Sequence, residues 1–435
     1  MLKKSTAATL ALVAVLAALG AEIWSARSHA GFAEREGRRV ARLVDASRIE
    51  RETARLAGMA GQAVRPGDAE IAKLLEARLA ETGLKTWDVA FDAEVREARE
   101  AERGRRPLRN LFALLPGRDP DARPVLLGTH YDASGPGPSD SSSAAAILLE
   151  SAEVLASIGS GGWKPERGLL FAFWDGGASG FLGSDAYVEQ ALRDRTSLSM
   201  AYVDVGSAAK GTEILARATP GLRGVLEEVL RAVPGSRAGT PSASGKNAFP
   251  LPRLTGDAAP FLGLTATPVV QLASASPSLL ARVLVLFAGT LASAPVVPYR
   301  FTEISDDFRT TLSVLEARAA SANDWVGALP GLEKALDGFS EAANRWDSGG
   351  PRLQRLSSRK AEPVNRLLEG AMDVFGPSGR PPVAWGRGSL LVGPESGDES
   401  VAAPHASLAR ALLARDFDAI RNECAERARA LAQAQ

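Results

Sequence analysis

Residues 168–184, GLLFAFWDGGASGFLGS, decide the fold that this sequence predicts. The first six residues form an apolar run, which predicts a strand buried on both faces of a sheet. The strand ends in a tight turn of small residues, at the edge where α/β sheets place ligands. This turn, Gly-Gly-Ala-Ser at residues 176–179, carries no carboxylate. It can therefore neither hold a divalent cation nor take a proton from water at neutral pH.

A second strand and its loop lie upstream of this stretch. Residues 124–127, PVLL, are apolar throughout, which predicts a central strand. The strand leads into a loop, GTHYDASGPGPSD, that ends at residue 140 and opens a helix. This loop brings His130, Asp132 and Asp140 to the carboxyl edge of the sheet, and Asp140 is also suited to cap the helix. A single loop histidine is more often hydrogen-bonded than metal-bound, but the three groups together indicate a site.

Apolar residues at helical spacing, and strand-like alternation, predict the other elements. These are helices over 32–84 with a break at Pro66-Gly67, a half-buried strand over 86–95, a charged and solvated loop over 96–109, a strand over 110–115, and helices over 144–158 and 279–294. Beyond residue 300 the sequence predicts amphipathic helices over 306–322, 331–345, 353–373 and 407–431, with a rigid Pro/Gly-rich stretch over 374–388.

Composition limits the class of protein. With 435 residues, 45% of them hydrophobic and 23% charged, the chain can bury a large core and is expected to form one large domain with an appendage. The 51 basic and 51 acidic residues balance, so we expect no nucleic-acid partner. A single cysteine, Cys424, excludes an internal disulfide and a cysteine-rich metal site. A histidine-based centre could draw only on His29, His130 and His405.

The N-terminus, residues 1–30, is predicted to be a targeting segment. Lys3 and Lys4 precede an uncharged stretch over residues 5–21, which Ile23 and Trp24 could extend to the membrane interface. We favour an uncleaved membrane anchor. A signal peptide cleaved after Ser-His-Ala at residue 30 is the alternative, and it would give a secreted or periplasmic protein. Both interpretations place the body of the protein outside the cytoplasm.

The loop GTHYDASGPGPSD, together with GWKPERGLLFAFWD at residues 162–175, resembles the co-catalytic zinc exopeptidases related to glutamate carboxypeptidase and the transferrin receptor. The flanking residues that agree with the family pattern are Trp163, Pro165, Arg167, Trp174, Asp175, Gly180, Gly183 and Ser184. The resemblance covers most of the chain after residue 46. It implies an α/β domain over 31–300 with a mixed, mostly parallel sheet flanked by helices, followed by a transferrin-receptor-like helical dimerisation domain over 301–435.

Carried over residue by residue, the resemblance gives an incomplete site. It implies that His130 matches a first-metal ligand, that Asp132 matches the carboxylate that orients this imidazole, and that Asp140 matches the aspartate that bridges two zinc ions. Gly177 stands at the position of the general-base glutamate. We therefore expect no catalytic residue.

Two further ligand positions of the family are lost. Ala178 replaces a glutamate and Gly206 replaces an aspartate, and the family's last histidine has no counterpart. A catalytic zinc needs about three protein ligands, so His130 and Asp140 would form at most a vestigial, weak site. We expect no cofactor, and zinc only if the site functions. The segment 96–109 is also too short for the protease-associated domain of the larger relatives.

The resulting expectation is a catalytically inactive homologue that acts outside the cytoplasm as a dimeric binding or scaffold protein. Its expected partners are a second copy through the C-terminal helices, the membrane through the N-terminal segment, and an unidentified protein or peptide ligand. One alternative is an active zinc aminopeptidase or carboxypeptidase with a rearranged site that recruits Asp175 or Asp204. The other is a structural subunit that heterodimerises with an active paralogue.

Overall fold

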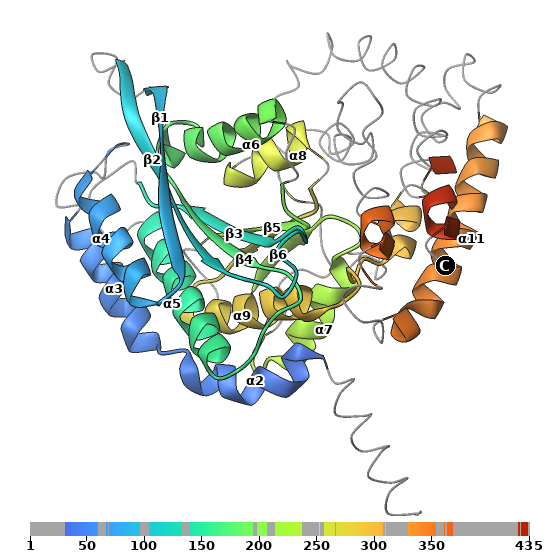
Figure 1. Ribbon diagram of the computed structural model, residues 1–435, viewed down its shortest axis with the longest axis horizontal. Coiled ribbons are helices and arrows are strands. Elements are labelled where there is room, and N and C mark those ends of the chain that lie inside the picture. Colours follow the sequence, from blue (N-terminus) through green and yellow to red (C-terminus); the bar gives the residue numbers. More distant parts are fainter. Residues whose placement is uncertain are drawn as a thin grey trace, which may run out of the picture.

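The centre of the protein is a mixed seven-stranded sheet with helices on both faces (Figure 1). The computed structural model describes residues 31–59, 67, 69–95, 104–132, 140–194, 198–206, 214–236, 252, 256–265, 267–307, 309, 329–353, 361, 363–368, 425–426 and 428–433. The strands are β1 (Lys85–Val95), β2 (Gly104–Leu115), β3 (Val125–His130), β4 (Leu169–Trp174), β5 (Ala201–Val205), β6 (Leu215–Ala218) and β7 (Val269–Ala273).

The strand order is β1-β2-β4-β3-β5-β7-β6. The four central strands β4, β3, β5 and β7 run parallel, whereas β1, β2 and β6 add antiparallel strands at the two sides. The expected α/β class with a mixed sheet flanked by helices is confirmed. The parallel centre aligns the carboxyl ends of β3, β4 and β5 at one edge, where the predicted site residues begin.

Helices cover the two faces unequally. One face carries most of them, and the other carries two helices, α6 and α8, that contact each other (Figure 1). The helices of the first face are α2 (Phe32–Leu43), α3 (Ala46–Met59), α4 (Ala69–Glu81), α5 (Asp140–Ser160), α7 (Arg223–Ala232) and α9 (Pro277–Ser293), and those of the second are α6 (Leu182–Asp194) and α8 (Ala259–Leu264). Short helices η2 (Gly177–Ser179) and η3 (Gly256–Ala258) lie at the carboxyl edge, and α11 (Leu329–Leu353) follows later in the chain.

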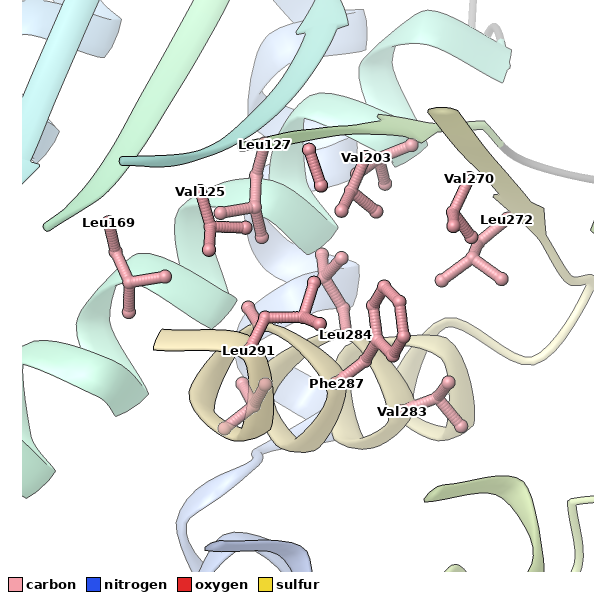
Figure 2. Packing of buried hydrophobic residues seen from close by; sticks show 14 of the residues in the cluster. Val125, Leu127, Leu169, Val203, Val270, Leu272, Val283, Leu284, Phe287 and Leu291 are labelled. Atoms are coloured by element: carbon pink, nitrogen blue, oxygen red, sulfur yellow. The ribbon is translucent and has the colours of Figure 1, made fainter. Parts of the chain in front are cut away.

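The larger core lies between the sheet and α9 (Figure 2). From the sheet, Val125, Leu127 and Val203 point toward the helix, and Phe287 and Leu291 of α9 meet them. Residues of the opposite parity, such as Leu126, belong to a second core under α6 and α8. Since side chains alternate along a strand, the unbroken apolar runs of β3 and β4 follow directly from burial on both faces.

One described helix is long and apolar enough to span a membrane. It covers Ser141–Ser160 within α5, and 78% of its most apolar window is buried inside the protein. That burial against the sheet is typical of the core helix of an α/β domain. The predicted targeting segment, residues 1–30, lies outside the described residues.

Two local predictions at β1 and β2 are wrong. The segment over 96–109 is not a loop throughout, because β2 begins at Gly104 and pairs with β1 from Val95↔Gly104 onward. The alternation of apolar and polar residues in β1 predicts one buried face, but residues 85–90 are all exposed. At the side of the sheet, the backbone pairing with β2 holds these residues in a strand although both faces are exposed there.

The C-terminal predictions are tested only in part. Helix α11 contains the predicted helix over 331–345 and buries Phe339 and Trp346 in the larger core. Much of the predicted helices over 306–322, 353–373 and 407–431, and the whole stretch over 374–388, lie outside the described residues. The domain boundary at residue 300 stays a prediction.

Candidate functional site

The candidate site lies at the carboxyl edge of the parallel strands. His130 is the last residue of β3 and is in register with Trp174, the last residue of β4. Immediately after β4, the chain turns through Gly176, whose φ of 76° lies in the left-handed region that favours glycine, into η2. The turn of small residues quoted from the sequence therefore lies beside His130, as the parallel pairing requires.

Asp132 holds this turn through its carboxylate. The side chain accepts the backbone N–H of Gly177 at 2.7 Å and that of Ala178 at 3.0 Å. Burial raises the pKa of Asp132 to about 6, although His130 and these two amides act in the opposite direction. Both carboxylate oxygens are thus engaged by the loop that carries the catalytic carboxylates in the resembled family.

The imidazole of His130 is oriented by a residue that sequence reasoning did not single out. Its Nδ1 lies 2.7 Å from Oδ2 of Asp257 in η3, and Oδ1 of Asp257 accepts the hydroxyl of Ser184 at 3.2 Å. The Asp257 side chain is 2% exposed and that of His130 is 30% exposed. Burial would lower the pKa of His130, but the carboxylate of Asp257, with Asp132 and Asp204 beyond it, raises it to about 9.

The histidine ring occupies the space next to the position of the expected general base. A Cβ atom at Gly177 would lie 2.2 Å from Cγ and 2.3 Å from Cβ of His130, far inside van der Waals contact. No side chain fits there unless His130 moves. The replacement of the glutamate by glycine and the present placement of the imidazole therefore depend on each other.

Asp204, one of the two carboxylates that a rearranged site could recruit, lies behind this pair. Its oxygens accept the hydroxyl of Tyr202 at 3.4 Å and the side-chain amide of Gln271 at 3.1 Å. Burial, and then the nearby charge of Asp257, raise the pKa of Asp204 well above its ordinary value. Two residues later, Gly206 offers only its backbone, which bonds to the carbonyl of Leu272 at 2.8 Å.

Asp175, the other candidate, is used by the backbone. Its carboxylate accepts the N–H groups of Gly67 and Arg109 at 3.0 and 2.9 Å, and the residue is fully buried. Asp140 is the first residue of α5, but its side chain lies outside the described part of the chain, as does all of His405.

These contacts do not fit a two-zinc centre. Two metals that share a bridging aspartate need about five protein ligands. Ala178 and Gly206 have no donor side chain, and both oxygens of Asp132 bond to amides. Among the described residues, no group of three or more histidine, cysteine, aspartate or glutamate side chains is arranged to hold a metal.

Comparison with known proteins finds relatives of the region that carries the motif. Residues 110–290 match the model of peptidase family M28. The chain is 33% identical over 178 residues to the probable glutamate carboxypeptidase VP8 of Zea mays, which covers 38% of this chain and 24% of that protein. It is 34% identical over 144 residues to transferrin receptor protein 2 of Homo sapiens, which covers 33% of this chain and 17% of that protein.

A solved structure with a similar arrangement is the LapA aminopeptidase of Legionella pneumophila. It superposes with a TM-score of 0.45 at 15% identity, covering 60% of this chain and 74% of that one. The two curated relatives are matched over about a quarter of their own length or less. The chain is similar to peptidase family M28 through residues 110–290, which are less than half of its length.

Proposed function

We propose that this protein is a non-catalytic M28 homologue that acts outside the cytoplasm as a membrane-tethered, dimeric binding or scaffold protein. The observation that carries the proposal is the pair His130–Asp257, whose imidazole fills the space beside Gly177. A peptidase of this family would need a carboxylate base at that place, and here neither the carboxylate nor room for it is present.

The chemistry of peptide hydrolysis supports the same conclusion. Water must be held by a metal and must lose a proton to a base, and a missing base alone costs roughly 10²- to 10⁴-fold in rate. Three acidic groups of the described residues are already bonded within the protein: Asp132 to the turn, Asp175 to two backbone amides, and Asp204 to Tyr202 and Gln271. Recruiting any of them would break interactions that the fold uses.

A binding protein can use the fold of a peptidase without hydrolysing peptides. One of the relatives is named a receptor, transferrin receptor protein 2, which supports a binding function on this scaffold. In the proposal, the C-terminal helices join two copies, the N-terminal segment anchors them to a membrane, and a protein or peptide is the ligand. A heterodimer with an active paralogue is the competing assembly, and a glutamate-bearing second subunit in the natively purified complex would identify it.

Zinc content and hydrolysis, measured on the same full-length preparation, test the loss of catalysis. After dialysis against zinc, we expect well under one zinc per chain and no hydrolysis of aminoacyl or glutamyl dipeptides above the buffer rate. The His130→Ala variant should behave identically, and LapA handled in parallel serves as the active control. Two zinc ions per chain that are lost in His130→Ala, together with turnover, would show that the protein is a working hydrolase.

A further inference from the structure

Strand β1 leaves a long side of the sheet open. It is the outermost strand and, in the described part of the chain, its only strand neighbour is β2 (Figure 1). All residues over 85–90 are exposed, including Trp87 at 38% and Val89 at 46%. A strand of 11 residues whose outer row of backbone groups meets no other described strand is a template for pairing with another strand.

The apolar residues of β1 continue a row of aromatic side chains that crosses the sheet. Trp87 stacks on Phe112 of β2 with ring centroids 5.3 Å apart, and Phe112 meets the edge of Trp174 in β4 at 5.7 Å. The row therefore reaches the open side without a polar residue to end it. Natural sheets commonly protect such a side with charged side chains. On the aromatic face of β1 only Lys85 carries a charge, whereas Asp88, Asp92 and Glu94 lie on the opposite face.

We infer that the occupant of this side is a second copy of the chain, paired antiparallel through β1 around a two-fold axis at Val89. This register pairs residues that are equally far before and after Val89. On the aromatic face it places Trp87 opposite Phe91 of the other copy and Val89 opposite Val89, so apolar side chains meet apolar ones. On the other face it places Asp88 opposite Ala90. Directly opposed aromatic and β-branched pairs stabilise antiparallel sheets.

The charges and the length of β1 together favour this register. An axis at residue 87 also opposes no carboxylates, but it pairs only residues 85–89 of the strand. With the axis at Val89, no carboxylate lies opposite another, and Asp92 faces Thr86. Axes at residues 88, 90, 91, 92 or 93 each oppose two carboxylates drawn from Asp88, Asp92 and Glu94. Like charges directly opposite are destabilising in a sheet, so the sequence of β1 complements itself over nine residues, from Lys85 to Ala93, in one arrangement.

This surface is distinct from the C-terminal helices of the proposed function and does not depend on whether the site is catalytic. It joins the sheets of two copies into one continuous sheet. A partner strand from another protein would use the same backbone groups but would not bring two copies of Val89 together. Cross-linking at that residue therefore separates the two cases.

The test uses the full-length chain with Cys424→Ala, so that each introduced cysteine is the only one present. Val89→Cys should form a disulfide-linked dimer under mild oxidation, since opposed residues in an antiparallel pair lie within the Cα separation that a disulfide needs. Leu215→Cys is the matched control, because Leu215 is also 46% exposed and also lies on an outermost strand, β6. We expect at least several-fold more dimer at residue 89, and equal yields, or none at residue 89, would overturn the inference.

A mixed experiment checks the register even if one variant folds poorly. Chains with Thr86→Cys and chains with Asp92→Cys, distinguished by tags of different size, are combined before oxidation. The inferred register predicts disulfides between the two kinds of chain and few between identical ones. Identical-chain disulfides in excess would overturn it. Val89→Lys, which opposes two ammonium groups at the axis, should reduce the mixed dimer several-fold, whereas Leu215→Lys should leave it unchanged.

Discussion

The Nδ1 atom of His130 lies 2.7 Å from a carboxylate oxygen of Asp257, a residue that follows it by 127 positions in the chain. In a zinc exopeptidase of the kind that this sequence resembles, the equivalent histidine would bind a metal. Here its charge is balanced by a buried aspartate on η3, which also holds the hydroxyl of Ser184. At this edge of the sheet, the paired imidazole therefore lies beside the turn that Asp132 holds.

The pair should be energetically coupled. The substitutions Asp257→Asn and His130→Asn should each lower the free energy of unfolding by about 1–3 kcal/mol. Each leaves the other member of the pair in place without its oppositely charged partner. Urea unfolding of the two single variants and the double variant, all at pH 7, measures the coupling. The double variant should cost clearly less than the sum of the singles, and strict additivity would contradict the pairing.

The pair should also make stability depend on pH. The pKa of His130 is raised from 6.5 to about 9. The stability that the protonated histidine gives to the folded protein is therefore complete below pH 6.5 and is lost as pH rises through 9. The stability lost between these limits should be about 1–3 kcal/mol. This is less than the free energy that corresponds to the whole pKa shift, because the His130 side chain is partly exposed to solvent. Unfolding curves from pH 6 to pH 10 measure it, and His130→Asn should flatten the profile.

Histidine titration tests the same group directly. The chain has three histidines, His29, His130 and His405, so their NMR signals can be assigned by single substitutions. We expect the His130 signal to titrate with a midpoint near 9 and to move toward 6.5 in Asp257→Asn. A midpoint near 6.5 in the unmodified protein would mean that the two side chains are not paired in solution.

Restoring the missing glutamate should not restore activity. Gly177→Glu forces a Cβ atom to within 2.2 Å of the His130 ring, so we expect a loss of at least about 2 kcal/mol in stability and no dipeptide hydrolysis. Ala178→Glu is the matched control, since Ala178 is exposed and should accept the longer side chain. Adding His130→Ala to Gly177→Glu should recover much of the lost stability. Thermal melts of the three variants and the unmodified protein would decide this, and a fully stable Gly177→Glu protein would contradict the described placement of His130.

Asp175 should behave as a structural residue. Asp175→Asn removes an acceptor from the amides of Gly67 and Arg109, which should cost about 1–3 kcal/mol and leave zinc uptake unchanged. Asp121→Asn, at an exposed position, should have little effect. A decrease in bound zinc in Asp175→Asn would instead favour a recruited metal ligand.

The sequence by itself determined the centre of the sheet and the defect in the site. The apolar runs at β3 and β4 predict strands buried on both faces, which the structure confirms, and the small residues 176–179 exclude a carboxylate whatever the surrounding fold. Those inferences rest on residue chemistry and on the two-residue period of a strand, both of which are local. The extension of β2 back to Gly104 was not predictable in this way, because its charged residues are stabilised by pairing with β1.

Only the tertiary structure decided which groups meet. Nothing near Asp257 in the sequence indicates that it faces His130, since the two are brought together by strand order and by the position of η3. The same holds for the closeness of Gly177 to the imidazole, which follows from β3 and β4 being parallel neighbours. Local patterns specify elements and composition specifies what a site lacks, but a contact across 127 residues exists only once the chain has folded.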